Sequence, residues 1–280
     1  MQAVERGVGI IGGQRLTMKV EVLLATINQT DDSVLDAMGV HSDVIVCNQN
    51  STKSGFAEYI KADSRVRWYD FQEKGVGLNR NNALIRAEGD ICLLADDDVQ
   101  YFENYESTVL RAFEMNPEAD VILFNIESPD GKKRSEDGKT RRINLHNCGK
   151  YGAVRIAFRR MSVIKNAIFF NQLFGGGCMF TAGEDTMFLR DCLRKKLRMI
   201  AVPDCILRLT DNRPSTWFEG YNQKFFEDFG SSYYCHYGSL AWAVTLLQLF
   251  RQRKKWLCDY PLWRAWSDAR RGIVRYKRLR

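Results

Sequence analysis

Clustered histidines and paired cysteines are missing from this chain. Its three histidines, His41, His146 and His236, stand far apart, and none of its eight cysteines belongs to a C-x-x-C pair. Zinc sites need such clusters, so the sequence argues against zinc. In a chain of 280 residues, dispersed cysteines are typical of reduced cytoplasmic thiols rather than of a disulfide framework.

Long apolar runs are also missing. No run reaches 18 residues, and the N-terminus lacks the apolar core of a signal peptide. We therefore expect neither a membrane-spanning helix nor a secretory signal. Only five prolines occur and 45% of the residues are hydrophobic, which favours a folded protein over disorder. The length suits one large α/β domain with a C-terminal appendage, or two small domains.

Positive charge is concentrated at the C-terminal end. Residues 251–280 hold eleven Lys and Arg against two Asp, a local balance of +9. Because the whole chain carries +7, the rest carries −2. A near-neutral body argues against a nucleic-acid groove, so we expect no nucleic-acid partner.

Short apolar runs alternate with helical patterns over the first half of the chain. Gly89 closes one predicted helix, Pro117 lies just after another, and Ser33 is a candidate cap for a short one. This alternation is typical of βαβ units in a mostly parallel, doubly wound sheet. The predicted strands cover residues 19–25, 43–50, 65–71, 91–95 and 119–126, and the predicted helices cover residues 78–90 and 105–116.

The second half of the chain is less regular. Residues 128–142 are polar and predict a loop, residues 183–197 predict a helix, and residues 199–207 predict a strand. The last 40 residues have the pattern of amphipathic helices.

Three adjacent carboxylates follow the predicted strand "ICLLA". Asp96, Asp97 and Asp98 repel one another, so a positive group must lie close to them. Ligands of open α/β sheets bind at the carboxyl ends of the strands, where Thr26, Asn28, Asn48 and Gln49 also fall. Hard oxygen ligands without His or Cys suit Mg²⁺ or Mn²⁺, although a single Asp is more often a turn or cap residue.

A second acidic pair, Glu184 and Asp185, follows the Gly-rich stretch "FGGGCMFTAG". Acidic residues in a first helical turn are stabilised by the helix dipole, which is a purely structural role. A carboxylate behind a Gly-rich approach can also act as a general base. The pattern alone leaves both roles open.

Together these motifs resemble family 2 glycosyltransferases, the inverting enzymes with the GT-A fold, over residues 19–229. The matching stretches are "GLNRNNALIRAEGDICLLADDD" and "GEDTMFLRDCLRKKLRMIAVPD". The stretch "STWFEGYNQKFFEDFG" is similar to one in bacterial members that build capsule, exopolysaccharide or lipopolysaccharide. The resemblance implies a GT-A domain with a C-terminal amphipathic helical tail.

The resemblance also implies roles for individual residues. Asp185, with Glu184 beside it, matches the base that deprotonates the acceptor hydroxyl, and Asp96 and Asp98 match the D-x-D motif that holds ribose and the metal–pyrophosphate. The other candidate donor-site residues are Thr26, Asn28, Asn48, Gln49, Gly75, Arg80, Asn81 and Asp97.

Two departures from the family pattern concern the donor site. Where members often have an Asp-Asp-Gly-Ser turn, this chain has "CNQN", so Asn48 and Gln49 would read the nucleotide base with amides. The late histidine that many members use as a metal ligand has no counterpart near Leu209 and Thr210, and His236 is a distant substitute.

We therefore predict an inverting transfer of a sugar from a nucleotide-diphosphate donor, with assistance from Mn²⁺ or Mg²⁺, and the resemblance favours a UDP-sugar as this donor. The acceptor would be a glycan or a lipid-linked sugar in surface polysaccharide synthesis. Residues 143–181 would shape the specificity for the sugar and the acceptor. A sugar-phosphate nucleotidyltransferase is an alternative, because "GIIGGQRL" resembles its Gly-rich loop, although here that stretch precedes the first predicted strand. A non-catalytic GT-A-like binding protein is the third interpretation.

The sequence suggests three segments. Residues 1–17 are Gly-rich and precede Met18, so we expect a disordered or non-native, dispensable leader. Residues 18–238 form the predicted catalytic domain, and residues 239–280 form a basic amphipathic tail. The tail carries Trp256, Trp263 and Trp266 among cations, which predicts docking on the anionic inner face of the plasma membrane from the cytoplasm. A homodimer contact or packing on the catalytic domain would equally explain the apolar stretch of this tail, residues 239–250.

Overall fold

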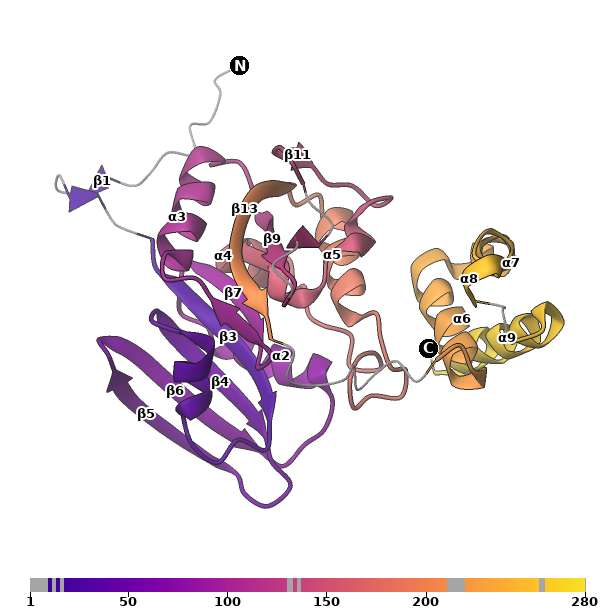
Figure 1. The fold of residues 1–280 in the computed structure, drawn as a ribbon, viewed down its shortest axis with the longest axis horizontal. Coiled ribbons are helices and arrows are strands. Elements are labelled where there is room, and N and C mark those ends of the chain that lie inside the picture. The colour runs from indigo at the N-terminus through magenta and orange to yellow at the C-terminus, as the bar shows by residue number, and fades with distance from the viewer. Residues whose placement is uncertain are drawn as a thin grey trace.

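A computed structural model describes residues 10–11, 14–15, 18–129, 133–134, 137–210, 220–256 and 260–279 (Figure 1). Its centre is a twisted mixed sheet with the strand order β11-β13-β9-β12-β7-β3-β4-β6-β5. Six strands of this sheet point the same way, because β12 is antiparallel to both β7 and β9 while the other neighbours among them are parallel. They are β3 (Val20–Ile27), β4 (Asp43–Gln49), β6 (Ser64–Phe71), β7 (Ile91–Asp96), β9 (Val121–Glu127) and β13 (Met199–Leu209).

These six strands confirm the predicted strands, and the α/β class with a mostly parallel centre is confirmed with them. Five antiparallel strands among the described residues of this sheet were not predicted, and the two longest are β5 and β12. β5 (Gly55–Lys61) is a largely exposed edge strand, so it lacks the apolar pattern of a buried strand. β12 (Ile156–Arg159) has only four residues, which is too short for a periodic signal.

Helices cover both faces of the sheet. One apolar core joins the sheet to α1 (Ser33–Met38) and α3 (Tyr105–Met115), and the other joins it to α2 (Val76–Arg86) and α5 (Glu184–Arg194). The predicted helices are confirmed within a few residues at their ends. The prediction for Ser33 is wrong in one detail: Asp32 occupies the N-cap position and Ser33 is the first helical residue.

The polar segment predicted as a loop contains two short strands. β10 (Lys133–Arg134) pairs with β9, and β11 (Arg141–Arg142) pairs with β13. Between β11 and α5 lie the short helices η1 (Cys148–Lys150), η2 (Ala153–Arg155) and α4 (Arg160–Lys165). After β7, the strand β8 (Val99–Tyr101) turns back to pair with β13.

Four helices at the C-terminal end form a separate small core, and we call them the helical unit (Figure 1). They are α6 (Gln223–Tyr237), α7 (Ala241–Arg251), α8 (Arg253–Trp256) and α9 (Leu262–Arg278), with η3 (Gly238–Leu240) before α7. Helix α6 packs extensively against α9. The predicted boundary between the catalytic domain and the basic tail, at residues 238 and 239, thus falls inside this set of helices. This division of the chain stays a prediction.

Little of the predicted leader can be assessed. Of residues 1–17 the structure describes β1 (Ile10–Ile11) and β2 (Gln14–Arg15), which form an antiparallel pair, and the rest lie outside the described residues. Among the described residues, no helix combines the length and apolar character needed to cross a bilayer.

Candidate active site

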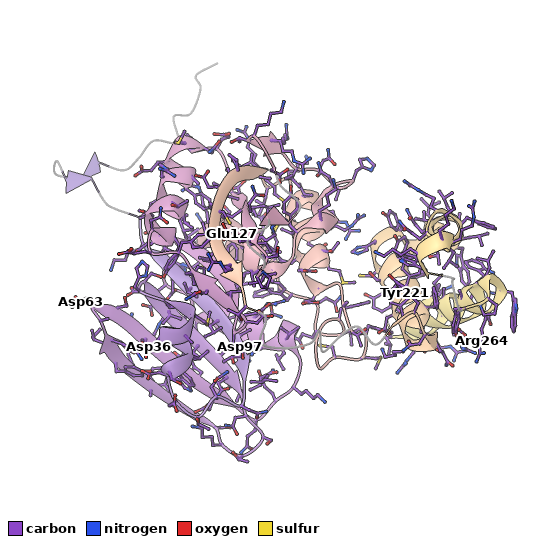
Figure 2. All side chains as sticks on the ribbon, viewed as in Figure 1. Asp36, Asp63, Asp97, Glu127, Tyr221 and Arg264 are labelled. Carbon is purple, nitrogen blue, oxygen red and sulfur yellow. The ribbon has the colours of Figure 1, made fainter. Side chains whose placement is uncertain are left out.

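The carboxyl ends of β3, β4 and β7 meet at one edge of the sheet. In the strand register Thr26 lies beside Asn48, and Ala25 lies beside Asp96. The polar residues that follow three buried strands are therefore gathered at this edge, as expected for the ligand crevice of an open α/β sheet. Figure 2 shows Asp97 at this edge, Arg264 on the helical unit and Tyr221 just before that unit.

The three adjacent aspartates have different surroundings. Asp96 Oδ1 accepts a hydrogen bond from Arg80 Nη2 at 2.7 Å. Asp97 Oδ2 accepts from Thr26 Oγ1 at 2.6 Å and from Gln29 Nε2 at 3.0 Å. Asp98 is exposed in the turn between β7 and β8, and its carbonyl accepts from the Thr210 amide. The cation beside Asp96 and the two donors to Asp97 thus offset part of the repulsion that the adjacency of the carboxylates suggested.

Arg80 is the positive group that the acidic stretch required. It is buried on α2 and forms two ion pairs, one with Asp96 and one between Nη1 and Glu184 Oε1 at 2.8 Å. Burial by itself disfavours the guanidinium charge, but the carboxylates of Asp96, Glu184 and Asp185 outweigh it and raise the pKa of Arg80. One arginine therefore connects the sheet edge to the first turn of α5.

The pKa of Asp185 lies far above the ordinary value of an aspartate. Gly183 precedes α5 with a φ of 112°, a left-handed conformation that favours glycine, and it turns the chain into the helix. Burial, and next the negative charge of Glu184, raise the pKa of Asp185 to about 7, against the opposing effect of Arg80. A carboxylate with a pKa near neutrality is suited to accept a proton from a hydroxyl.

The two amides at the end of β4 are occupied within the protein. Asn48 Nδ2 donates to Asp70 Oδ1 at 2.6 Å and to the Gln29 carbonyl, and its Oδ1 accepts from the Gln29 amide. Gln49 exchanges hydrogen bonds with both backbone groups of Gly75. These contacts fix the loop after β3 and the turn before α2, so both amides hold these two segments at the sheet edge.

Helix α2 places three successive side chains in three directions. Asn79 Nδ2 donates to the carbonyls of Thr26 and Cys47 and so fastens α2 to two strand ends. Asn81 exchanges hydrogen bonds with the backbone of Phe170. Among the described residues, Asn79 Oδ1 and Arg80 Nε are buried without a hydrogen-bond partner. Of the predicted Arg-Asn pair, only Arg80 thus reaches the acidic residues.

The loop after β3 leaves Asn28 exposed with a φ of 54°, and its amide donates to the Gln49 carbonyl at 3.0 Å. Gly75 lies between the sheet edge and the Gly-rich segment 175–177, and the Val76 amide donates to the Gly176 carbonyl. The start of α2 and the glycines therefore form one packed wall beside the sheet edge.

A polar cluster that the sequence analysis missed joins this wall to the helical unit. Asp228 of α6 accepts from the amide and the hydroxyl of Thr181, at 2.9 and 2.6 Å. Lys224 Nζ contacts both Asp228 oxygens and the Met179 carbonyl. The stretch "STWFEGYNQKFFEDFG" contains both α6 residues, at the i, i+4 spacing of a helical ion pair, which was the available signal.

The carboxylates of the acidic edge have the ligand chemistry that Mg²⁺ and Mn²⁺ prefer. Among the described residues, no three His, Cys, Asp or Glu side chains come together to hold a metal ion. Asp96 and Asp98 offer only carboxylate oxygens, which fits Mg²⁺ or Mn²⁺ with water and pyrophosphate as further ligands. His236 does not fit: burial, with Arg190 and Arg194 next to it, lowers its pKa to about 3, and two cations disfavour a third.

Comparison with known proteins identifies the family and the fold. A family model described as "Glycosyl transferase family 2" matches residues 19–193. A comparison with curated proteins gives no match. The structure is similar to S. aureus TarS 1-349 in complex with UDP-GlcNAc, with a TM-score of 0.58 and 17% identity over 90% of this chain and 79% of that one. It is also similar to TarS 1-349 in complex with UDP, with a TM-score of 0.54 and 14% identity over 94% and 92% of the two chains.

Proposed function

This chain belongs to glycosyl transferase family 2, and from that premise we propose that it transfers a sugar from a UDP-sugar to a hydroxyl of a glycan or lipid-linked acceptor, with inversion at the sugar carbon. Membership of the family makes it a glycosyltransferase with a GT-A fold that uses a nucleotide sugar. The UDP and UDP-GlcNAc complexes of TarS support UDP-sugars as the first donors to test. The resemblance to capsule and lipopolysaccharide enzymes supports a role in surface polysaccharide synthesis.

The ion-pair bridge through Arg80 is the observation that carries the proposal. Arg80 contacts Asp96 at the sheet edge and Glu184 on α5, while Asp185 is the next residue on that helix. A donor at the sheet edge and a base on α5 would then face each other across one buried cation. Such an arrangement fits a single displacement, in which the acceptor and the leaving group lie on opposite sides of the sugar.

The proposed reaction needs one base and one leaving group. The acceptor oxygen attacks the anomeric carbon, its proton goes to the Asp185 carboxylate, and the bond from that carbon to the β-phosphate oxygen breaks. UDP leaves with the electron pair. No covalent enzyme intermediate is required, so the configuration inverts. The raised pKa of Asp185 supports this role, because a base is most effective when its pKa is near the working pH.

The donor pyrophosphate is expected at the acidic edge. Asp96 and Asp98 would hold a divalent cation between the protein and the phosphates, which otherwise face carboxylates of the same sign. When bound, Mg²⁺ or Mn²⁺ supplies stabilisation of the negative charge that develops on the leaving diphosphate. We assign Asp97 to fixing the strand end, because its Oδ2 accepts hydrogen bonds from Thr26 and Gln29.

A donor panel tests the proposal. The purified chain with Mn²⁺ is incubated with UDP-, GDP-, dTDP- and CDP-sugars, and thermal shift and release of the nucleoside diphosphate are measured. We expect a shift and slow diphosphate release with a UDP-sugar and none without the cation. Binding of GDP- or CDP-sugars instead would contradict the choice of UDP as the donor nucleotide. Equal binding of UDP-sugars without a metal would contradict the role of the divalent cation.

The two alternative functions have less support. The Gly-rich stretch that suggested a nucleotidyltransferase precedes β3 and is described only at Ile10–Ile11 and Gln14–Arg15, and the matched family is one of glycosyl transferases. Against a non-catalytic binding protein stands the carboxyl of Asp185, because a pKa near neutrality beside an ion-paired Glu184 is more typical of a catalytic site.

A further inference from the structure

Helix α7 is apolar on two sides. Ala241, Thr245 and Leu249 face the core of the helical unit and are buried. On the opposite side Leu240, Ala243, Leu247 and Phe250 are exposed, at the i, i+3, i+7 and i+10 spacing of a helix face. We call these four residues the apolar stripe.

The apolar stripe exposes large side chains. Leu240 is 67% exposed, Leu247 56% and Phe250 45%. A surface helix of a globular protein normally carries polar residues on the side away from its core. Contiguous exposed apolar surface is typical of a site that contacts a membrane or another protein.

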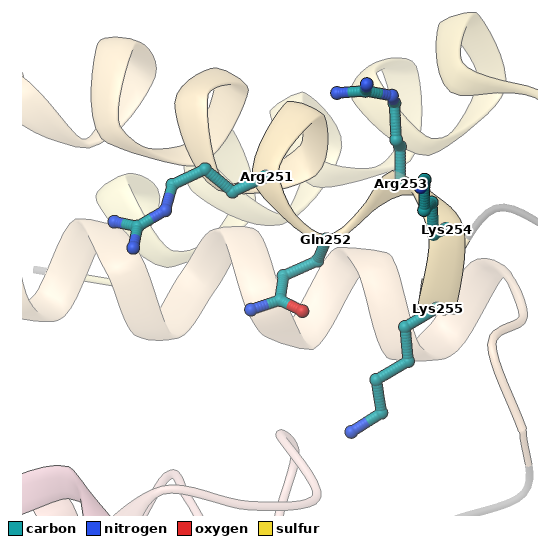
Figure 3. Close-up of a pocket in the computed structure, with 5 residues that line it drawn as sticks. All are labelled: Arg251, Gln252, Arg253, Lys254 and Lys255. Carbon is teal, nitrogen blue, oxygen red and sulfur yellow. The ribbon is translucent and has the colours of Figure 1, made fainter.

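Cations follow directly after the apolar stripe. Arg251, Arg253, Lys254 and Lys255 line a surface hollow at the junction of α7 and α8, together with Gln252 (Figure 3). Among the described residues, no carboxylate forms an ion pair with Arg251, Arg253 or Lys255. We call Arg251, Arg253, Lys254 and Lys255 the cationic cluster.

We propose that the apolar stripe and the cationic cluster bind the surface of a bilayer that contains anionic lipids. The stripe enters the boundary between headgroups and acyl chains, and the cluster contacts the lipid phosphates. A second copy of this chain fits the surface less well, because it would bring four more cations against the same cluster. Lipid phosphates have the opposite charge.

The tryptophans contribute less than the sequence suggested. Trp256 packs against Phe225 and Phe229 of α6, and Trp266 belongs to the same core. Only Trp263 of the three is largely exposed, at 72%. The bilayer contact therefore rests on α7 and α8 rather than on a row of tryptophans.

The helical unit is fastened to the wall of the active site. Asp228 of α6 holds Thr181, only four residues before Asp185. Tyr276 of α9 packs edge-on against the stacked rings of Phe174 and Phe180, which flank the Gly-rich segment. A bilayer bound by α7 would therefore lie at a fixed position relative to the proposed base. This inference goes beyond the proposed function, because it concerns a surface outside the active site.

Vesicle co-sedimentation of the full chain tests the inference without donor or acceptor. The protein is mixed at low salt with vesicles of phosphatidylcholine and phosphatidylglycerol, and in parallel with pure phosphatidylcholine. We expect binding to the anionic vesicles that weakens with salt. Leu247→Gln with Phe250→Gln should lower partitioning roughly tenfold for each side chain. Changing Arg251, Arg253 and Lys255 to Gln should lower it about fivefold for each charge.

A matched control is Met115→Gln at the end of α3, where an exposed apolar side chain lies outside the apolar stripe and the cationic cluster. This variant should bind vesicles like the unchanged chain. Protein that stays in the supernatant at low salt, or that binds pure phosphatidylcholine equally well, would overturn the inference. So would a dimer in analytical ultracentrifugation that the Leu247 and Phe250 changes dissociate, since the stripe would then be occupied by a second copy. Failure of the donor panel leaves each of these readouts unaffected.

Discussion

The sheet edge and the helical unit are built on opposite principles. At the edge, buried charges are satisfied by one another, and Arg80 lies between Asp96 and Glu184. In the helical unit, aromatic and small residues pack closely, and α6 crosses α9 at Gly230 and Gly272, where a Cβ would overlap the backbone of the other helix. The edge is thus specified by charge balance and the helical unit by shape.

This difference predicts how each region responds to change. A substitution at the edge should alter chemistry or charge balance and leave the helices packed. A substitution between the helices should loosen α6 and α9 and leave donor binding intact. The polar cluster of Thr181, Lys224 and Asp228 is the point where the two regions meet.

The largest effect is expected from Asp185→Asn. Removing the base should lower transfer by about 10²–10⁴-fold, while donor affinity stays within about tenfold, because the lost interaction acts mainly in the transition state. Initial rates and donor titration measure the two quantities. Asp191→Asn, on the same helix and in an exposed ion pair, is the control and should act normally. Equal losses of donor affinity and turnover would mean that Asp185 binds the donor and is not the base.

The next effect is expected from Asp98→Asn. Loss of a proposed metal ligand should lower kcat/KM by about 10²–10³-fold and remove the metal dependence of donor binding. Calorimetric titration of a UDP-sugar with and without Mn²⁺ measures this dependence. Asp63→Asn changes an exposed turn residue whose φ of 67° Asn adopts readily, so it should bind normally. Unchanged Mn²⁺-dependent binding in Asp98→Asn would refute the assignment.

Arg80→Met tests the charge balance itself. Removing the shared cation leaves Asp96 and Glu184 facing each other, and we expect the free energy of unfolding to fall by about 3–5 kcal/mol. Urea denaturation measures it. Arg65→Met breaks exposed ion pairs with Glu58 and Glu88 and should cost less than about 1 kcal/mol. Equal costs in the two variants would mean that the bridge adds no special stability.

Gly272→Ala tests the shape-dependent region. The added methyl group would overlap the Glu227 carbonyl, and overpacking of this kind costs about 1–3 kcal/mol. Hydrogen exchange should speed up in α6 and α9 while the donor affinity is unchanged. Gly55→Ala is the control, because nothing lies within 4 Å of a Cβ at that position. A weaker donor affinity in Gly272→Ala would show that the two regions are coupled.

The smallest effect is a pH-dependent stability change at Asp185. Burial raises its pKa from an ordinary 3.8 to about 7, so the folded state favours the neutral carboxyl. The stability from this group is complete below pH 3.8 and is lost as the pH rises through about 7. Asp185→Asn should therefore raise the Tm by about 2–4 °C at pH 8 and by less at pH 5. A gain in Tm that does not depend on pH would contradict the shifted pKa. So would a transfer rate that stays constant as the pH is lowered below 7.

Much of the sheet could be predicted because its strands are buried on both faces. A continuous apolar run such as that of β7 indicates a buried strand, and Asp96 to Asp98 at its end indicate where the site lies. The exposed edge strand β5 could not be found this way, since its side chains mostly face water. Asp185 and Arg80 were identified from motifs, but the ion pairs of Arg80 with Asp96 and Glu184 were not.

The sequence by itself determined the α/β class, the acidic strand end and the amphipathic helices, because burial on a sheet or helix imposes a periodic local pattern. Only the tertiary structure decided that Arg80 reaches two carboxylates from different elements, that Asn48 and Gln49 are occupied within the protein, and that α7 has its apolar stripe on the surface. Each of these depends on which distant segments meet. A local pattern cannot specify such contacts, since they follow from how the whole chain packs.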